Sequence, residues 1–345
     1  MSSLNTHAIQ SSFELPEYKF VPLSNVFKQS VETNWLIEDY IPKPSVGMLY
    51  GPSGTGKSHI ALHMAACIAN GIQWCSKTTE QGVVLVMAGE GHGGLTKRLK
   101  SIEKHHEIEI NQGNIFFSER AIGVDTEDGF KDLMNAIEAL DEKPDLIIID
   151  TLSRHLMKSS ENSNEDMAYF INKLEQIKQA YDTSIMIVHH TGKNQKSGSR
   201  GASSIRANID FSLVLKPFEF NKVRLSELFI EKQKDADDRI PELSFRVTPV
   251  ELDEEDKNGK KIKGACVAQV GFMSKTKSEE YEEIAVECFE SEKPQWQKNF
   301  VEAVDDGDLS LASKKRKFRD TVNRLVENGI VKEVEPKIFA LTSSQ

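Results

Sequence analysis

The sequence predicts a doubly wound α/β fold with a mostly parallel sheet, antiparallel strands added at one edge, and a small C-terminal winged helix. Three observations support this prediction. Short apolar runs alternate with amphipathic helices up to residue 190, strand-like segments without helices follow residue 208, and the pattern changes again near residue 275. The alternation is typical of a parallel sheet with crossover helices, whereas consecutive strands without helices indicate antiparallel pairing.

The predicted parallel strands are apolar runs at residues 45–50, 82–88, 114–118, 144–150 and 184–190. The run "PDLIIID" at 144–150 is apolar almost throughout, which suits a strand buried on both faces. Between these runs we expect one helix that ends near residue 70 and three further helices over residues 93–106, 126–140 and 164–181. Thr126 is suited to the N-cap of the third helix.

The remainder of the chain predicts a sheet extension and a second domain. Strand-like segments follow residue 208, and Asn258-Gly259 is the tight turn expected between the last two. An acidic stretch then leads to helical segments and a short hairpin, which is the order of a winged helix. The predicted organisation is a lead-in over 1–34, the large α/β domain over 35–275, and a DNA- or protein-binding winged helix over 276–345.

Composition narrows the class of protein. Hydrophobic residues make up 39% and charged residues 28% of the 345 positions, as in an ordinary globular protein. No apolar stretch approaches the roughly 20 residues that span a bilayer, and the first residues lack a signal-peptide core. We therefore expect a cytoplasmic protein without a membrane partner. The net charge of −10 argues against nucleic-acid binding over the whole surface but allows local basic sites.

Cysteine and histidine spacing indicates no metal motif. The four cysteines include no CxxC pair, so we expect reduced, structural thiols. His59 and His63 lie one helical turn apart but lack the intervening glutamate of a zincin. Packing on the helix is the favoured interpretation of both.

The segment "GPSGTGKS" lies between the first predicted strand and the first long helix. Its glycines allow backbone amides to turn onto phosphate oxygens, and the helix N-terminus adds its positive dipole end. Lys57 would reach the β- and γ-phosphates, and Ser58 would ligate Mg²⁺. We predict a binding loop for ATP and Mg²⁺ made of Gly51, Pro52, Ser53, Gly54, Thr55, Gly56, Lys57 and Ser58.

Two acidic residues end predicted strands that lead to the same edge of the sheet. Asp150 ends the fourth strand, which is the expected position of a second Mg²⁺ ligand. Glu90 follows the second strand and is the predicted catalytic carboxylate, which would polarise a water for in-line attack on the γ-phosphate. The residue after Asp150 is Thr151, so the catalytic acid is not expected beside it.

Five segments in order resemble the RepA-type branch of the RecA-like ATPases, whose best-known member is a hexameric plasmid replicative helicase. They are "WLIEDYIPKPSVGMLYGPSGTGKSHIALHMA", "VVLVMAGEGHGGLTKRL", "PDLIIIDTLSRHL", "IMIVHHTGK" and "SRGASSIRANID". The resemblance runs from Trp35 to about residue 250. It implies a RecA-like fold, a homo-oligomeric ring of six copies, and DNA-stimulated ATP hydrolysis coupled to movement on single-stranded DNA. It also implies a plasmid or phage origin, with a replication initiator or a primase among the expected partners.

The resemblance assigns roles to the region after the fifth strand. His189 and His190 match the position that senses the γ-phosphate. The loop over 191–208 corresponds to a loop that faces the ring channel, where basic side chains follow the phosphates of one strand. The residues expected to contact DNA there are Lys193, Lys196 and Arg200.

A cation from a neighbouring subunit is also expected, because charge develops on the transferred phosphoryl group. The candidates are Lys232, Arg206 and Arg200. Lys232 lies in "IEKQKD", which resembles the Lys-x-Arg element of DnaB-like helicases, although Lys234 stands here in place of the arginine. Lysine lacks the guanidinium fork, so this departure leaves the identity of the trans cation open. Lys232 is the favoured candidate, and the two arginines stay unresolved.

The C-terminal segment "SLASKKRKFRDTVNRLVENG" predicts a helix with one apolar face and one basic face, because Phe318, Val322, Leu325 and Val326 fall at helical spacing. The cations expected to contact DNA are Lys314, Lys315, Arg316, Lys317 and Arg319. The same basic face also suits an acidic protein segment, and both partners stay open. The alternative function is an ATP-switched DNA-binding initiator or regulator without unwinding activity.

Overall fold

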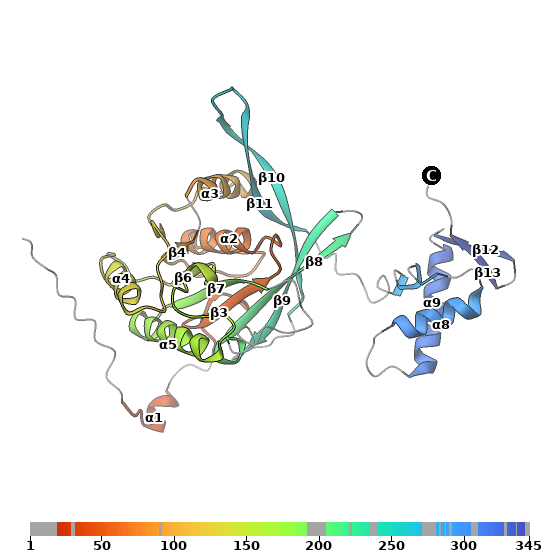
Figure 1. Cartoon of the computed structure of the whole chain (residues 1–345), viewed down its shortest axis with the longest axis horizontal. Helices are drawn as coiled ribbons and strands as arrows, with labels where there is room; N and C mark the ends of the chain where they lie inside the picture. The colour runs from red at the N-terminus through yellow and green to blue at the C-terminus, as the bar shows by residue number, and fades with distance from the viewer. Residues whose placement is uncertain are drawn as a thin grey trace, which may run out of the picture. The chain divides into compact units, whose positions relative to one another are not determined.

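The computed structural model describes residues 19–28, 32–89, 92–191, 205–220, 223–234, 240–270, 281–282, 284–286, 288–289, 292–304, 310–327, 330–335 and 337–341. The chain divides into two compact units, Met1–Phe272 and Met273–Gln345 (Figure 1). Each unit is described by itself.

A nine-stranded sheet forms the centre of the first unit, in the order β11-β10-β9-β8-β3-β7-β6-β4-β5. The parallel strands are β3 (Val46–Gly51), β4 (Val84–Ala88), β5 (Ile115–Phe117), β6 (Leu146–Asp150), β7 (Ser184–His190) and β8 (Phe211–Phe220). The antiparallel continuation is β9 (Val223–Gln233), β10 (Leu243–Glu255) and β11 (Lys261–Val270). The predicted RecA-like α/β fold is confirmed.

One strand differs from the prediction of an antiparallel extension, because β8 pairs parallel with β3. The chain leaves β7 at its carboxyl end and enters β8 beside the amino end of β3. Asp210 fixes this entry, since its N–H donates to the Val46 carbonyl (2.7 Å) and its carboxylate accepts the Val46 N–H (3.0 Å). Antiparallel pairing therefore begins only at β9.

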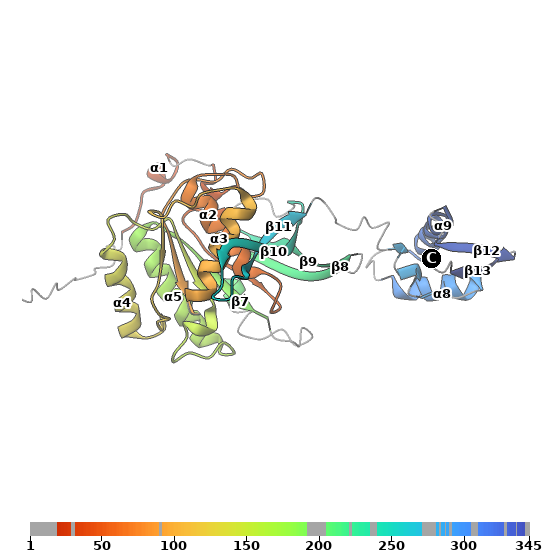
Figure 2. The ribbon, with the colours of Figure 1, turned by 90° about the horizontal axis from the view of Figure 1, so that it is seen from above.

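Helices cover both faces of the sheet (Figures 1 and 2). The side chains of α2 (Lys57–Asn70) and α3 (His92–His106) join one core, and those of α4 (Glu127–Glu138) and α5 (Asn164–Tyr181) join the other. Strand β6 alternates between the two cores, with Ile148 in the first and Ile149 in the second. This burial on both faces explains its continuous apolar run. As predicted, Thr126 caps α4, and its Oγ1 accepts the Gly129 N–H (3.0 Å).

Short elements precede the sheet. Helix α1 (Leu23–Val26) buries none of its residues. The small hairpin of β1 (Trp35–Ile37) and β2 (Ile41–Pro42) instead buries Leu36, Ile37 and Ile41 in the core. Among the described helices, none is long and apolar enough to cross a bilayer.

The second unit contains α8 (Lys293–Ala303), α9 (Leu311–Glu327) and the hairpin of β12 (Val331–Glu335) and β13 (Ile338–Leu341). Helices followed by a hairpin are the order expected for the winged helix. Trp296 is fully buried, and its indole N–H donates to the Ala285 carbonyl (2.6 Å). The predicted apolar face of α9 was too wide, because Phe318, Val322 and Leu325 are buried but Val326 is 40% exposed.

Candidate nucleotide-binding site

The loop between β3 and α2 depends on glycine geometry. Gly54 and Gly56 have φ values of 77° and 91°, in the left-handed region that favours glycine. Gly56 is also the N-cap of α2, and a Cβ there would lie 3.0 Å from Val247 Cγ2. Thr55 closes the loop, since its hydroxyl donates to the Pro52 carbonyl (2.9 Å). The glycine backbone and this hydrogen bond therefore fix the loop at the N-terminus of α2, which is the positive end of the helix dipole.

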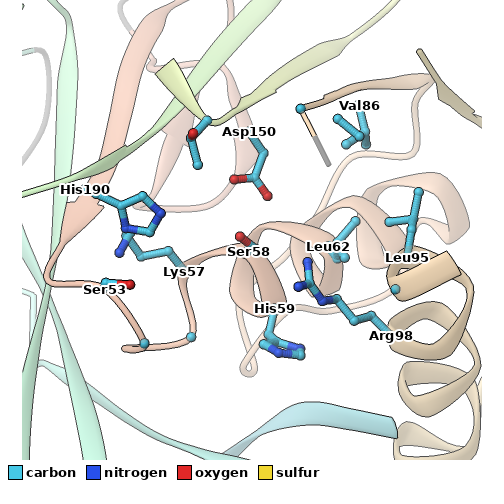
Figure 3. A pocket seen from close by; sticks show the side chains of 16 residues that line it. Ser53, Lys57, Ser58, His59, Leu62, Val86, Leu95, Arg98, Asp150 and His190 are labelled. Atoms are coloured by element: carbon cyan, nitrogen blue, oxygen red, sulfur yellow. The ribbon is translucent and has the colours of Figure 1, made fainter. Parts of the chain in front are cut away.

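A cavity of about 260 Å³ lies over this loop, where β3, β4, β6 and β7 end (Figure 3). Predicted residues from separate parts of the sequence line it, namely Ser53, Gly54, Gly56, Lys57, Ser58, Asp150 and His190. Crevices at the carboxyl ends of parallel strands are the usual ligand sites of such sheets. The structure thus brings the predicted phosphate loop, the predicted Mg²⁺ ligands and one predicted sensor to a single pocket.

Lys57 is held inside the loop. Its Nζ donates to the carbonyl oxygens of Gly51 (2.9 Å) and Pro52 (2.7 Å), and the residue is 2% exposed. Burial lowers the pKa of Lys57 to about 8, although the charge of Asp150 partly opposes this shift. The Lys57 ammonium therefore donates to two neutral carbonyl oxygens, and charged phosphate oxygens would accept stronger hydrogen bonds from it.

Ser58 and Asp150 offer oxygen ligands on facing sides of the pocket, as Figure 3 shows. Strand pairing fixes Asp150, which lies opposite Ala88 on β4 and Val188 on β7. A hydroxyl and a carboxylate are hard ligands of the kind that Mg²⁺ uses together with phosphate oxygens. These side chains therefore fit a Mg²⁺-nucleotide.

The end of β4 leads toward the predicted catalytic carboxylate. The Gly89 N–H donates to the Asp150 carbonyl (2.7 Å), and Gly89 lines the pocket. A Cβ at Gly89 would lie 2.5 Å from the Cβ of Arg154, so the two segments pass closely. Glu90 itself lies outside the described residues, and its catalytic role stays a prediction.

Only one of the two predicted sensor histidines lines the pocket. His190 lies opposite Gly51 in the sheet register, and Figure 3 shows its ring beside Lys57. His189 does not line the pocket and is 6% exposed. Burial, with the charges of His190 and Lys57, lowers the pKa of His189 to about 4. His189 is thus a neutral buried side chain. It points away from the pocket because successive residues of a strand face opposite sides of the sheet.

Lys232, the favoured trans cation, is occupied within its own chain. Its Nζ donates to the carbonyl oxygens of Arg206 (3.0 Å) and Ile209 (2.6 Å). Arg206 is also engaged, since its guanidinium donates to Glu231 (3.2 Å) and to the Tyr50 hydroxyl (3.4 Å). Both side chains therefore stabilise the turn that leads into β8, a local role that no sequence pattern indicated.

Lys234 is the most exposed member of this basic cluster. Its side chain is 63% exposed, and its Nζ lies 3.5 Å from Asp210. Lys232, Lys234 and Arg206 are all absent from the lining of their own chain's pocket, as a residue that acts on a neighbour would be. Lys232 as the trans cation stays a prediction, the exposed Lys234 is a further candidate, and Arg200 lies outside the described residues.

The predicted DNA contacts are placed only in part. Lys193, Lys196 and Arg200 lie outside the described residues. On α9, the Lys314 Nζ donates to the Val304 carbonyl (2.5 Å), and the Lys317 Nζ lies 4.5 Å from the centre of the Tyr281 ring. The remaining cations of the predicted set, Lys315, Arg316 and Arg319, are exposed. The basic surface of α9 is thus smaller than its sequence indicates.

Arg98, which no sequence pattern indicated, also lies in the pocket, where α3 places it (Figure 3). Arg98 belongs to the basic run Lys97-Arg98-Lys100, and nothing in that run distinguishes it. Its direction follows from the packing of α3 against β11, where a Cβ at Gly264 would lie 2.2 Å from Ser101 Oγ. His59 also lines the pocket, and burial with the charge of Arg98 lowers its pKa to about 4.

Comparison with known proteins gives a family and two similar structures. The sequence profile of a family described as an AAA domain matches residues 12–196. Flagellar accessory protein FlaH from Methanocaldococcus jannaschii is 16% identical with a TM-score of 0.43, over 67% of this chain and 91% of that chain. A KaiC-like protein from Pyrococcus horikoshii OT3 is 17% identical with a TM-score of 0.45, over 62% of this chain and 90% of that chain.

Proposed function

The chain belongs to the AAA domain family, and on this premise we propose that it hydrolyses Mg²⁺-ATP and moves on single-stranded DNA as a ring. The observation that supports hydrolysis most directly is the convergence of Lys57, Ser58 and Asp150 on one pocket. The functional parallel that we infer from the sequence resemblance is the replicative-type DNA helicase of a plasmid or phage. A hexamer, loaded by a replication initiator or working with a primase, is part of this proposal.

The proposed reaction gives a part to four side chains of the pocket and to Glu90. Lys57 would exchange its two loop carbonyls for β- and γ-phosphate oxygens. Ser58 and Asp150 would hold Mg²⁺, which would neutralise the negative charge that develops during phosphoryl transfer. His190 would contact the γ-phosphate from the end of β7. Glu90 would orient the attacking water, a role that its place one residue after Gly89 supports.

The second half of the site would come from a neighbouring copy. Charge spread over the transferred phosphoryl group needs a further cation, and Arg98 already supplies one within the chain. Lys234 would supply the other in trans, because it is the exposed member of its cluster. This arrangement makes hydrolysis depend on assembly.

Movement on DNA would be driven by the loop that begins after His190. Lys193, Lys196 and Arg200 follow this residue in the sequence, so a shift of His190 on loss of the γ-phosphate would displace them. In a ring, such cations would follow the phosphates of one strand in the channel. The exposed cations of α9 would add contacts that do not depend on sequence.

A second function is favoured by one specific observation. The exposed cations of α9 belong to a separate compact unit, so DNA binding need not be coupled to hydrolysis. An ATP-switched initiator or regulator would use the winged helix for recognition and ATP only for oligomerisation.

ATP turnover with and without DNA distinguishes the two functions. The full chain is assayed alone, with a single-stranded oligonucleotide and with the same sequence as a duplex, and the mass of the assembly is measured in the same buffer. We expect a ring-sized mass and stronger stimulation by the single strand, with no turnover in Lys57→Ala. Turnover that is insensitive to both forms of DNA would favour the regulator and contradict the translocating ring.

A further inference from the structure

A cluster of nitrogen and sulfur ligands lies outside the nucleotide pocket, between the C-terminal end of α3 and strand β11. It consists of His105, His106 and Cys266, whose ligand atoms all lie within 4.8 Å of one another. Cys266 is 0% exposed, His106 is half-buried and His105 is exposed. Cys266 is distant in sequence from the two adjacent histidines, and the packing of α3 against β11 brings it to them.

Hydrogen bonding prepares His106 for a ligand. Its Nε2 lies 3.0 Å from the Val267 carbonyl, an acceptor that requires this nitrogen to carry the proton. The other ring nitrogen, Nδ1, is then left with a lone pair. A backbone carbonyl that fixes the tautomer of an imidazole in this way is the usual outer partner of a metal-bound histidine.

A third histidine gives an independent indication. His63 stacks on His106 with ring centres 3.9 Å apart, and it is 8% exposed. Its Nδ1 is buried without a hydrogen-bond partner among the described residues. A buried polar atom of this kind is costly unless something satisfies it, and the ring that carries it packs on the ring of His106.

We propose that His105, His106 and Cys266 bind a zinc ion that fastens β11 to α3. Imidazole nitrogen and thiolate sulfur are the ligands that Zn²⁺ prefers, in tetrahedral geometry with a fourth position for water. Tetrahedral ligands lie about 3.4–3.6 Å apart, so the cluster closes by about 1 Å around the ion. The exposed side chain of His105 can make this movement without disturbing the core.

The zinc site would influence the nucleotide pocket through β10 and β11, which pack against the phosphate loop. Val247 on β10 and Val267 on β11 lie against Gly56 of the phosphate loop, and Cys266 precedes Val267 directly. An ion that fixes β11 to α3 would therefore fix the wall of the loop as well. This ion would be separate from the Mg²⁺ of the pocket.

Cobalt titration tests this site without reference to ATP. The reduced, tag-free full chain is titrated with Co²⁺ in excess Mg²⁺ and without nucleotide, and thiolate-to-cobalt charge-transfer absorption is recorded. The variants are His105→Ala, Cys266→Ser and the control Cys288→Ser, whose thiol lies in the other compact unit. Circular dichroism verifies the fold of each chain.

We expect one equivalent of Co²⁺ in the wild type, displaced by Zn²⁺, and an unchanged band in Cys288→Ser. Cys266→Ser should lose the band, and His105→Ala should bind at least ~10-fold more weakly, which is the least that loss of an outer partner costs. Zn²⁺ should also raise the Tm of the wild type by a few degrees. Absence of a saturable band in the wild type, or equal affinity in His105→Ala, would overturn the proposal. His105→Ala decides the matter if Cys266→Ser does not fold.

Discussion

The free pocket stabilises the positive charge of Lys57 only weakly. Burial lowers its pKa to about 8, and the groups that hold it are two neutral carbonyl oxygens and the more distant Asp150. A triphosphate would bring several negative charges to the same place. Bound nucleotide therefore favours the protonated lysine, and binding and protonation of Lys57 are linked.

Nucleotide binding at pH 8.5 should consequently take up protons. About three quarters of Lys57 is neutral at this pH in the free protein, and binding raises its pKa, so affinity weakens as the pH rises above about 8. Calorimetric titration in two buffers of different ionisation enthalpy measures the uptake. Lys57→Arg keeps a cation that stays charged and should abolish it. Equal apparent enthalpies in the two buffers for the wild type would be inconsistent with this linkage.

Glu90→Gln should separate binding from turnover. The amide keeps the shape of the carboxylate but does not accept a proton from the attacking water, so turnover should fall by at least ~100-fold while nucleotide affinity is retained. Single-turnover hydrolysis and equilibrium binding measure the two quantities. Lys57→Ala is the matched control that loses both. Near-wild-type turnover in Glu90→Gln would assign the water to another carboxylate.

At the scale of elements, strands with strong local signals could be predicted and long-range partners could not. The apolar run of β6 predicts burial on both faces, and the glycines of the phosphate loop predict a left-handed backbone. The structure shows both features. Arg98 and Lys232 are different, because their surroundings are set by elements far away in the sequence. The parallel direction of β8 likewise depends on where the chain returns to the sheet, which no local pattern encodes.

Helix α9 should contribute to DNA affinity through three cations and not five. Each phosphate contact to a single strand steepens the dependence of log affinity on log salt by about 0.7. The triple change Lys315→Gln, Arg316→Gln and Arg319→Gln should therefore reduce the slope by about 2. Binding at several salt concentrations checks this, with Lys257→Gln, Lys260→Gln and Lys263→Gln as a control of equal charge on the β10–β11 hairpin. Identical slopes would indicate that α9 binds an acidic protein segment instead.

At the scale of the whole molecule, the two compact units should be separable. The sheet is complete at Val270, and the second unit has its own core around Trp296 and Phe318. Removal of the chain from Ser278 onward should leave the main thermal transition, ATP turnover and its stimulation by single-stranded DNA in place. Calorimetry and an ATPase assay measure these properties. Loss of cooperative unfolding in the shortened chain would show that the large unit needs the small one.

Mixed assemblies of two inactive chains test hydrolysis between subunits most directly. Lys57→Ala lacks the phosphate-loop cation and Lys234→Ala lacks the proposed trans cation, so each should be nearly inactive alone. In a 1:1 mixture about a quarter of head-to-tail interfaces would pair an intact loop with an intact cation, and turnover should recover toward that fraction. A mass measurement verifies that both chains enter one assembly. Mixed assemblies with no more activity than the separate chains, or full turnover by Lys234→Ala alone, would contradict the proposal.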